Sequence, residues 1–338
     1  MRRSLIATFV LVTMTTPVLA ATPGVQPVPV APAGRLVDTS HPNRYVGTGT
    51  PASCTSAAVV AAVRAGGVIR FRCGSAPVTI VMRQTAKVLN TRTRVVLDGQ
   101  GKVTLSGGGV RRILYMNTCD KTLVWTTSHC QNQATPQLVV QNLTFTRGNS
   151  TGQHQEGGGG GAIFVRGGRV KVVASRFINN RCDATGPDLG GAALRVLSQY
   201  RNLPVYVTRS TFTGGVCSNG GALSSIGVSW IVSNSRFTNN RAIGRGANPA
   251  SPGTPGGGSG GAIYLDGNRF GLRVAGTLIE DNRANEGGGA IFFVSNDRTG
   301  TLAIDRSTLR RNVSGRFQNA PGIYFLGDRF VRSLAIIR

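Results

Sequence analysis

Apolar and polar positions recur in a fixed order along the second half of the chain. From residue 138 onward, an alternating apolar segment is followed by an aromatic or aliphatic anchor, a polar turn and a second apolar segment that begins with two glycines. The anchors are Phe145, Phe177, Phe212, Phe237, Ile279 and Leu309. The positions seven and five residues before each anchor are apolar, as in Leu138 and Val140. Alternation with a period of two predicts a short strand that buries one face.

The turn after each anchor has a pattern of its own. The residues three positions after the anchors are Asn180, Asn240, Asn282 and Asn312, with Gly148 and Gly215 in the two other copies. Asn and Gly tolerate a left-handed backbone better than other residues do, so a tight turn is predicted at this position. Asn side chains stacked in this way are also able to hydrogen-bond from one copy to the next.

The length of the repeat selects the architecture. The shortest spacing between two anchors, from Phe212 to Phe237, is 25 residues. This length suits three strands and three turns, and the 3.6-residue period of a helix-pair repeat is absent. The copies therefore predict a β-solenoid with three strands per coil, in which coils stack at about 4.8 Å and like residues lie on like.

The chain before residue 138 is less regular. Strand-like segments cover residues 68–71, 78–82, 94–98, 103–106, 113–116 and 123–126. The Ala-rich segment from Ser56 to Ala65 ends at two glycines and predicts a short helix that caps the N-terminal end of the solenoid. Residues 1–20 have the two arginines, apolar stretch and small residues of a signal peptide. Residues 21–50 then predict an extended lead-in, and residues 51–338 the solenoid itself.

Six cysteines in an exported chain suit three disulfides. The favoured pairs are Cys54 with Cys73, Cys119 with Cys130, and Cys182 with Cys217. Sequence proximity supports all three pairs. The repeat gives the third pair further support, because its two cysteines each lie five residues after an anchor and neighbouring coils would place them side by side.

The repeat resembles known families. Gly-Gly-Ala-Ile segments paired with Phe-x-x-Asn turns are similar to the repeats of polymorphic outer-membrane proteins, and residues 95–107 look like an early coil of the pectate lyase-like superfamily. The resemblance covers residues 52–338. It implies an all-β, single-stranded right-handed parallel β-helix with three strands per coil and a short N-terminal capping helix. It is specific for the fold and not for the function, because the repeated residues are those that the coil itself needs.

The charge of the chain points to acidic partners. Net charge is +25, and removal of Arg2 and Arg3 with the signal peptide would leave +23. Acidic polysaccharide, lipopolysaccharide, anionic lipid surfaces and extracellular nucleic acid are the candidate polyanions. Of the 38 basic residues 34 are Arg, a skew that base composition of the genome also produces. Charge alone therefore names no ligand.

Few residues suggest catalysis. The aspartate motifs of polygalacturonases are absent, and the three histidines, His41, His129 and His154, are widely separated, so no metal site is predicted. Elimination from a uronate needs a cation, a base and, as cofactor, Ca²⁺ bound by several oxygens. The candidate catalytic residues for this reaction are Glu280, Asp281, Arg241 and Arg283. No lyase motif accompanies them, and a solvated polar turn explains them better than a catalytic site does.

Insertions between the anchor and the paired glycines indicate where function lies. They include residues 150–156, 183–189 and 243–259, and they all fall at the same point of the repeat. Loops from successive coils would project together at one corner, where solenoids usually bind their partners, although neutral drift at a corner that tolerates insertions explains the clustering equally. The cations expected to bind a ligand at this edge are Arg181, Arg241, Arg245 and Arg283.

The sequence therefore predicts a protein that is secreted, periplasmic or on the cell surface after signal-peptide cleavage. Its expected function is noncatalytic binding of an acidic polysaccharide or another polyanion through the loop-rich, Arg-rich edge. The alternatives are a polysaccharide lyase or related carbohydrate-active enzyme, with Ca²⁺ as cofactor, and a purely structural surface protein. The sequence indicates no oligomeric state.

Overall fold

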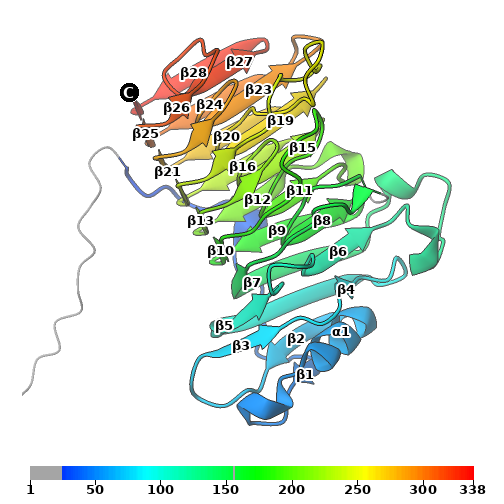
Figure 1. Ribbon diagram of the computed structural model, residues 1–338. Coiled ribbons are helices and arrows are strands. Elements are labelled where there is room, and N and C mark those ends of the chain that lie inside the picture. Colours follow the sequence, from blue (N-terminus) through cyan, green and yellow to red (C-terminus); the bar gives the residue numbers. More distant parts are fainter. Residues whose placement is uncertain (1–24, 155–156) are drawn as a thin grey trace, which may run out of the picture.

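The chain folds into one elongated stack of coils (Figure 1). The computed structural model describes residues 25–154 and 157–338. The predicted signal peptide, residues 1–20, lies outside the described residues. All helices within the described ranges are too short or too polar to cross a lipid bilayer.

Three parallel sheets run along the axis of the stack. The main sheet has 17 strands in two rows, and the other sheets have eight and four strands. The first row of the main sheet comprises β1 (Arg44–Val46), β2 (Gly67–Phe71), β5 (Arg94–Ser106), β7 (Gln137–Thr146), β9 (Arg169–Val173), β12 (Val205–Thr208), β16 (Trp230–Ser233), β20 (Gly271–Ala275), β24 (Thr301–Asp305) and β28 (Arg329–Ser333). The second row comprises β3 (Val78–Val81), the second halves of β5 and β7, β10 (Arg176–Ile178), β13 (Thr211–Thr213), β17 (Arg236–Thr238), β21 (Leu278–Glu280), β25 (Thr308–Arg310) and β29 (Ile336–Ile337).

The remaining strands close each coil. The eight-stranded sheet comprises β4 (Ala86–Lys87), β6 (Leu114–Asn117), β8 (Ile163–Arg166), β11 (Leu194–Val196), β15 (Leu223–Ile226), β19 (Ile263–Gly267), β23 (Ile291–Ser295) and β27 (Ile323–Leu326). The four-stranded sheet comprises β14 (Val216–Cys217), β18 (Arg241–Ala242), β22 (Arg283–Ala284) and β26 (Val313–Ser314). The helical elements are α1 (Ser56–Ala65) and the 3₁₀ turns η1 (Pro32–Gly34), η2 (Pro51–Ser53), η3 (Lys121–Leu123), η4 (Cys130–Asn132) and η6 (Tyr200–Asn202). This arrangement confirms the predicted all-β parallel β-helix.

The anchors stack in register, as the repeat predicts. Phe145, Phe177, Phe212 and Phe237 are paired strand to strand, and the centroids of successive rings lie 5.0, 4.8 and 4.7 Å apart with the rings nearly parallel. Buried apolar side chains from every coil join these rings in one continuous core. Like residues therefore lie on like along the axis, and the core fixes the register of the outer surface.

The turn asparagines form the expected ladder. The main-chain N–H and the Nδ2 of Asn240 donate to Oδ1 of Asn282 at 2.9 Å each. Asn282 donates in the same way to Asn312, at 3.2 and 2.8 Å. The N–H groups of Gly148 and Gly215 donate to Asn180 and Asn240. Buried amides therefore hold the turns of neighbouring coils together.

The six cysteines pair as predicted. Cys54 bonds Cys73, Cys119 bonds Cys130, and Cys182 bonds Cys217, with Cα–Cα distances of 5.6, 5.0 and 4.7 Å. Cys182 and Cys217 lie beside an isolated parallel bridge between Arg181 and Val216, so they join equivalent positions of adjacent coils. This disulfide clamps the edge that carries the expected ligand-binding cations.

The N-terminal part confirms one expectation and corrects another. Helix α1 spans the predicted residues, is capped by Thr55, whose side chain accepts from Ala58 N–H, and covers the N-terminal end of the core with Val59 and Val63. The strand expected at residues 123–126 is absent. Asp120 accepts a hydrogen bond from Thr122 N–H and starts η3 instead. The disulfide between Cys119 and Cys130 then closes this excursion from the coil.

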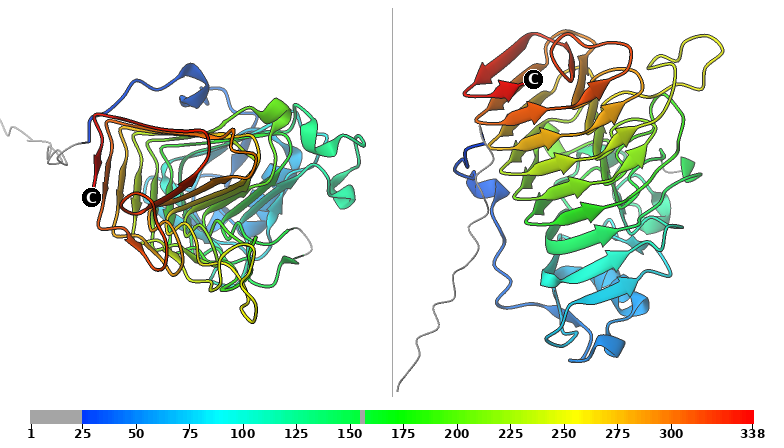
Figure 2. Two further views of the ribbon diagram at one scale, coloured as in Figure 1. Left: turned by 90° about the horizontal axis from the view of Figure 1, so that it is seen from above. Right: turned by 60° about the vertical axis from the view of Figure 1, so that its left-hand side comes forward.

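Residues 25–43 are bound to the solenoid along its length. We call them the N-terminal strap. The residues that contact the strap through hydrogen bonds are, in the order of the strap, Arg306, Asn234, Thr208, Lys171, Gln141, Asp98 and Val68. Because these partners descend in number, the strap runs against the direction of stacking, and it lies across the coil from the long loops (Figure 2). The segment expected as a lead-in is therefore extended and also attached, and β1 within it already pairs with β2.

Asp98 anchors the strap and makes its attachment sensitive to pH. Its buried carboxylate accepts from Thr39 Oγ1 at 2.6 Å, Gln141 Nε2 at 3.2 Å, Asn142 Nδ2 at 3.0 Å and Gln100 N–H at 2.9 Å. Burial alone would raise the pKa of Asp98, but these hydrogen bonds lower the pKa overall. A carboxyl group with a lowered folded-state pKa stabilises the fold fully above its unfolded-state pKa of about 3.9 and loses that contribution as pH falls through the folded-state pKa.

We therefore expect the strap to loosen below about pH 4. Hydrogen-exchange protection factors should fall for the amide of Val37, which donates to Gln141 beside Asp98. Protection of the Asn43 amide, which donates to the Val68 carbonyl and has no carboxylate partner, should persist and serves as the control. Equal protection of the Val37 amide above and below about pH 4 would contradict this role of Asp98.

Candidate functional site

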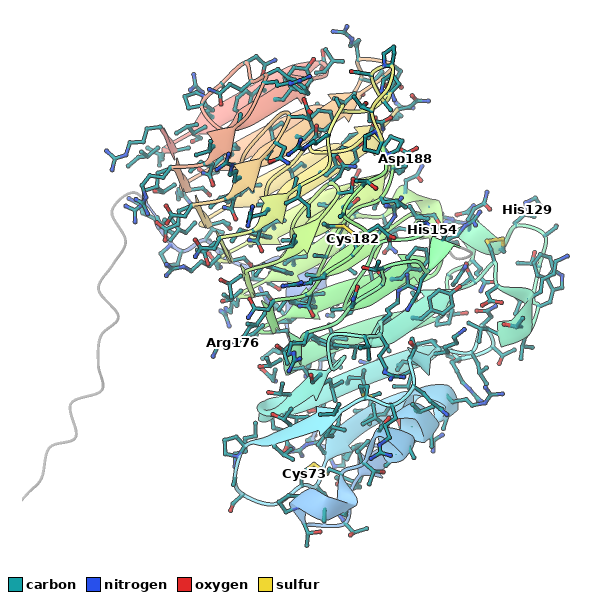
Figure 3. All side chains as sticks on the ribbon, viewed as in Figure 1. Cys73, His129, His154, Arg176, Cys182 and Asp188 are labelled. Atoms are coloured by element: carbon teal, nitrogen blue, oxygen red, sulfur yellow. A yellow bond between two sulfur atoms is a disulfide. The ribbon has the colours of Figure 1, made fainter. Side chains whose placement is uncertain are left out.

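The long loops gather at one corner of the coil, as predicted. Gly152 N–H donates to Asp183 Oδ1 at 2.8 Å, which joins the loops at 150–156 and 183–189, although residues 155–156 are outside the described part. Gly186 N–H donates to the Gly256 carbonyl at 3.1 Å, and Asn248 Nδ2 donates to Asp188 Oδ1 at 2.9 Å. Cys182, His154 and Asp188 all belong to this corner (Figure 3). The three loops therefore form one surface.

Exposed arginines form a column beside this corner. Arg181 is bridged to Val216, Val216 pairs with Arg241, and Arg241 pairs with Arg283. The three arginines therefore occupy one position of successive coils, with one gap at Val216. Arg245 follows at the base of the loop at 243–259, where it bridges Gly256. The structure brings together all four cations that the sequence proposed.

The paired glycines explain why the backbone of this edge is so closely packed. A Cβ on Gly221 would lie 2.4 Å from the main-chain nitrogen of Arg241, and a Cβ on Gly261 would lie 2.7 Å from the main-chain carbon of Arg283. Any side chain at these glycines would push the arginine strands outward. Gly221 and Gly261 therefore place the backbone that carries Arg241 and Arg283.

The two acids expected beside these arginines have other partners. Glu280 Oε1 and Oε2 lie 2.7 to 2.9 Å from guanidinium nitrogens of Arg236, Arg310 and Arg311, and Asp281 pairs with Arg311 at 2.7 Å. Glu280 is buried on β21, in register with Thr238 and Arg310, whereas the chain turns at Asn282 before it reaches Arg283. The turn therefore separates residues that are neighbours in sequence, and the grouping of Glu280 and Asp281 with Arg241 and Arg283 does not form.

These ion pairs also set the charge of the edge. The Arg311 guanidinium lowers the pKa of Asp281, and Asp281 in turn raises the pKa of Arg311. Both acids of this region are thus neutralised. Within residues 25–154 and 157–338, Arg181, Arg241, Arg245 and Arg283 have no acidic partner within salt-bridge distance. Their charges face solvent.

A polar recess extends the column toward the N-terminal end of the solenoid. It has a volume of about 470 Å³ and is lined by Arg147, Arg181, Asn149, Asn179 and glycines of three coils. Arg147 has a left-handed backbone, with φ of 49°, at the turn position that Asn179 and Gly214 occupy in the next coils. Sequence reasoning missed Arg147, although its place directly before Gly148 marks the same turn. We call Arg147, Arg181, Arg241, Arg245 and Arg283 the arginine edge.

A buried cation lies beneath the loops. The outer face of the eight-stranded sheet carries, in register, Tyr115, Phe164, Arg195, Ser224, Tyr264 and Phe292. Arg195 is 3% exposed, and its Nε and Nη1 have no hydrogen-bond partner among the described residues. Burial lowers the pKa of Arg195 to about 10. Sequence reasoning missed it, because one polar residue in a short apolar strand reads as a solvent-facing position.

Polar side chains beside Arg195 fix the longest loop. Tyr264 donates from its hydroxyl to Asp266 Oδ2 at 3.0 Å, and Asn248 Nδ2 donates to that hydroxyl at 2.8 Å. Burial and the neighbouring Asp266 raise the pKa of Tyr264, so its hydroxyl stays protonated at neutral pH. The loop at 243–259 is therefore tied to the sheet that it covers.

The histidines are not arranged as metal ligands. His154 Nε2 lies 3.4 Å from Asp183 Oδ1, and His41 contacts Ser40. His129 precedes η4 on the excursion closed by Cys119 and Cys130. In the part of the chain that the structure describes, no three His, Cys, Asp or Glu side chains are grouped to hold a metal ion.

Comparison with known proteins finds one similarity. Residues 234–266 and 276–294 match the Chlamydia polymorphic membrane protein repeat. No curated protein and no solved structure matches the chain. The match includes β17 to most of β19 and β21 to most of β23, the coils that carry Arg241 and Arg283. It agrees with the resemblance seen in the Phe-x-x-Asn and Gly-Gly-Ala-Ile segments, and these coils are similar to those of a membrane-protein repeat.

Proposed function

We propose that this chain is a cell-surface or secreted β-helix protein that binds an acidic polymer along the arginine edge. The observation that supports this most is the column of Arg181, Arg241 and Arg283, which have no acidic partner within salt-bridge distance among residues 25–154 and 157–338. The surface location rests on the similarity to the polymorphic membrane protein repeat. Acidic polysaccharide is the favoured class of polymer, because a regular row of cations suits a regular row of carboxylates or sulfates.

The geometry favours an extended ligand that lies along the solenoid axis. Successive coils are about 4.8 Å apart. Arg241 and Arg283 lie on neighbouring coils, and Arg181 lies two coils from Arg241 toward the N-terminal end. Guanidinium groups bind carboxylate, sulfate and phosphate through two parallel hydrogen bonds. The clustered loops at the same corner then offer contacts to the uncharged parts of the polymer.

Binding explains this surface better than elimination does. A uronate lyase needs acids free to bind Ca²⁺, and Glu280 and Asp281 are held by Arg236, Arg310 and Arg311 instead. Incubation with uronate polymers, with and without Ca²⁺, is therefore expected to yield no unsaturated chain ends.

Loss of edge arginines is expected to weaken polymer binding. We expect the double variant Arg241→Gln/Arg283→Gln to bind polygalacturonate or a sulfated polysaccharide about tenfold more weakly, because each substitution removes a charge-assisted hydrogen bond. The dissociation constant is measured by titrating the protein over surface-immobilised polymer. The double variant Arg269→Gln/Arg273→Gln removes the same charge from exposed positions away from the edge and is the matched control. Equal losses in both double variants would show that only net charge matters.

A further inference from the structure

The N-terminal strap and the main sheet enclose a pocket. Its volume is about 240 Å³, and its lining residues lie on β5, β7, β9 and β12 and on the strap. The strap runs on the side of the coil away from the loops (Figure 2). Ala33 and Val37 of the strap form one wall. The pocket is therefore separate from the arginine edge.

Three cations converge on this pocket. Arg94, Gln137 and Arg169 are in register on neighbouring strands, and Lys171 projects from the same face two residues beyond Arg169. None of the residues that line the pocket is acidic. Burial, with the added effect of Arg94 and Arg169, lowers the pKa of Lys171. Like charges are thus held close together, and a bound anion would relieve their repulsion.

Lys171 shows how the pocket is held open. Its Nζ donates to the carbonyls of Ala33 and Arg35 in the strap, at 3.1 and 2.7 Å. Two of its three N–H donors are therefore used, and one is left for a ligand. The strap would lose this contact if Lys171 turned away, so the same side chain fixes the wall and supplies charge.

The rest of the lining is apolar. Val139 on β7 packs with Val37 of the strap, and Tyr206 on β12 is half-buried. Small-molecule sites combine such apolar surface with a few polar groups that fix orientation. The volume admits one small ring but no length of polymer, and the strap limits the approach on one side.

We propose that this pocket is a second binding site, which takes one ring of an anionic sugar. The carboxylate or phosphate of the sugar would be bound by Arg94 and Arg169, with Lys171 as a third donor. The ring would pack against Tyr206 and Val139. A free monosaccharide or the end of a chain fits this description, whereas the arginine edge is suited to the middle of a polymer.

Calorimetric titration of the full chain tests the proposal. The ligands are glucuronate, glucose 6-phosphate, inorganic phosphate and glucose, which separate the carboxylate, the phosphate, the oxyanion alone and the ring alone. We expect saturable binding of glucuronate or glucose 6-phosphate and none of glucose. Arg94→Gln and Arg169→Gln should each weaken binding about tenfold, since each loses a charge-assisted hydrogen bond. Arg273→Gln, in register with Lys171 and Tyr206 on the same face but outside the pocket lining, is the control and should change binding less than about twofold.

Several results would overturn the proposal. They are no binding of either anionic sugar, binding of inorganic phosphate as tight as that of glucose 6-phosphate, and equal losses in Arg273→Gln. Wild-type protein supplies a second measurement that needs no variant: bound sugar should raise hydrogen-exchange protection of Val37 in the strap, and unchanged protection would also count against the site. The variant Arg241→Gln/Arg283→Gln should keep its affinity for the sugar, so failure here is distinguishable from failure at the arginine edge.

Discussion

Replacement of Arg195 by methionine is expected to raise the free energy of unfolding by about 3 kcal/mol at neutral pH. Burial lowers the pKa of this guanidinium from an ordinary 12.5 to about 10, and one pKa unit corresponds to about 1.36 kcal/mol. Methionine keeps most of the packing of the aliphatic stem and removes a buried charge whose Nε and Nη1 have no partner among the described residues. Urea denaturation of both proteins measures the difference.

Arg195→Lys is the control for this experiment. It keeps a buried cation in the same column between Phe164 and Ser224, so it should show no gain in stability. A loss of stability in Arg195→Met would mean that, in the folded protein, favourable interactions of the guanidinium outweigh the cost of burying its charge. The cation would then belong to the polar surface beneath the loops and not to a strained interior.

Replacement of Phe212 by alanine is expected to lower the free energy of unfolding by about 4 kcal/mol. Its ring is 1% exposed and stacks between Phe177 and Phe237, at centroid distances of 4.8 and 4.7 Å. The backbone on either side is fixed by parallel pairing to both neighbouring coils, so the cavity has little means of collapsing. Thermal and urea unfolding, read by circular dichroism, measure the loss.

Phe330→Ala supplies the comparison for the stack. This ring lies in the last coil, is only half-buried and packs at the margin of the core, so its loss should cost clearly less. Equal effects of the two substitutions would contradict the view that buried stacking between coils supplies the stability of the solenoid.

The repeat made most of the coil predictable. Anchors such as Phe212, the turn asparagines and the partners Cys182 and Cys217 all occupy equivalent positions of successive coils, and stacking turns sequence equivalence into contact. The positions of Arg181, Arg241 and Arg283 followed from the same equivalence.

Features that do not repeat could not be placed from the sequence. The strap makes its contacts through isolated pairs such as Thr39 with Asp98 and Val28 with Asn234, which lie far apart in the chain and follow no period. Glu280 was grouped with Arg283 because the two are close in sequence, but the chain turns at Asn282 between them and Glu280 pairs with Arg236, Arg310 and Arg311 instead. Arg195 was missed because its burial depends on loops from other coils that cover the sheet.

The structure divides the surface into two parts with different charge arrangements. At the arginine edge the cations stand in a row and face solvent, whereas under the strap Arg94, Arg169 and Lys171 converge on one small pocket. A row suits many weak, equivalent contacts with a polymer, and a convergent pocket suits one small ligand. This difference leads to different expectations for salt dependence, which is steep where many counterions are released.

The salt dependence of polymer binding tests the role of the arginine edge most directly. The dissociation constant for the acidic polysaccharide should be measured over a range of salt concentrations for the wild type, Arg241→Gln/Arg283→Gln and the control Arg269→Gln/Arg273→Gln. By analogy with nucleic acids, where each neutralised phosphate contributes about 0.7 to 0.9 to the slope of log affinity against log salt, the edge variant should show a slope smaller by about one to two. The control should keep the slope of the wild type. An edge variant with an unchanged slope would contradict binding through these arginines.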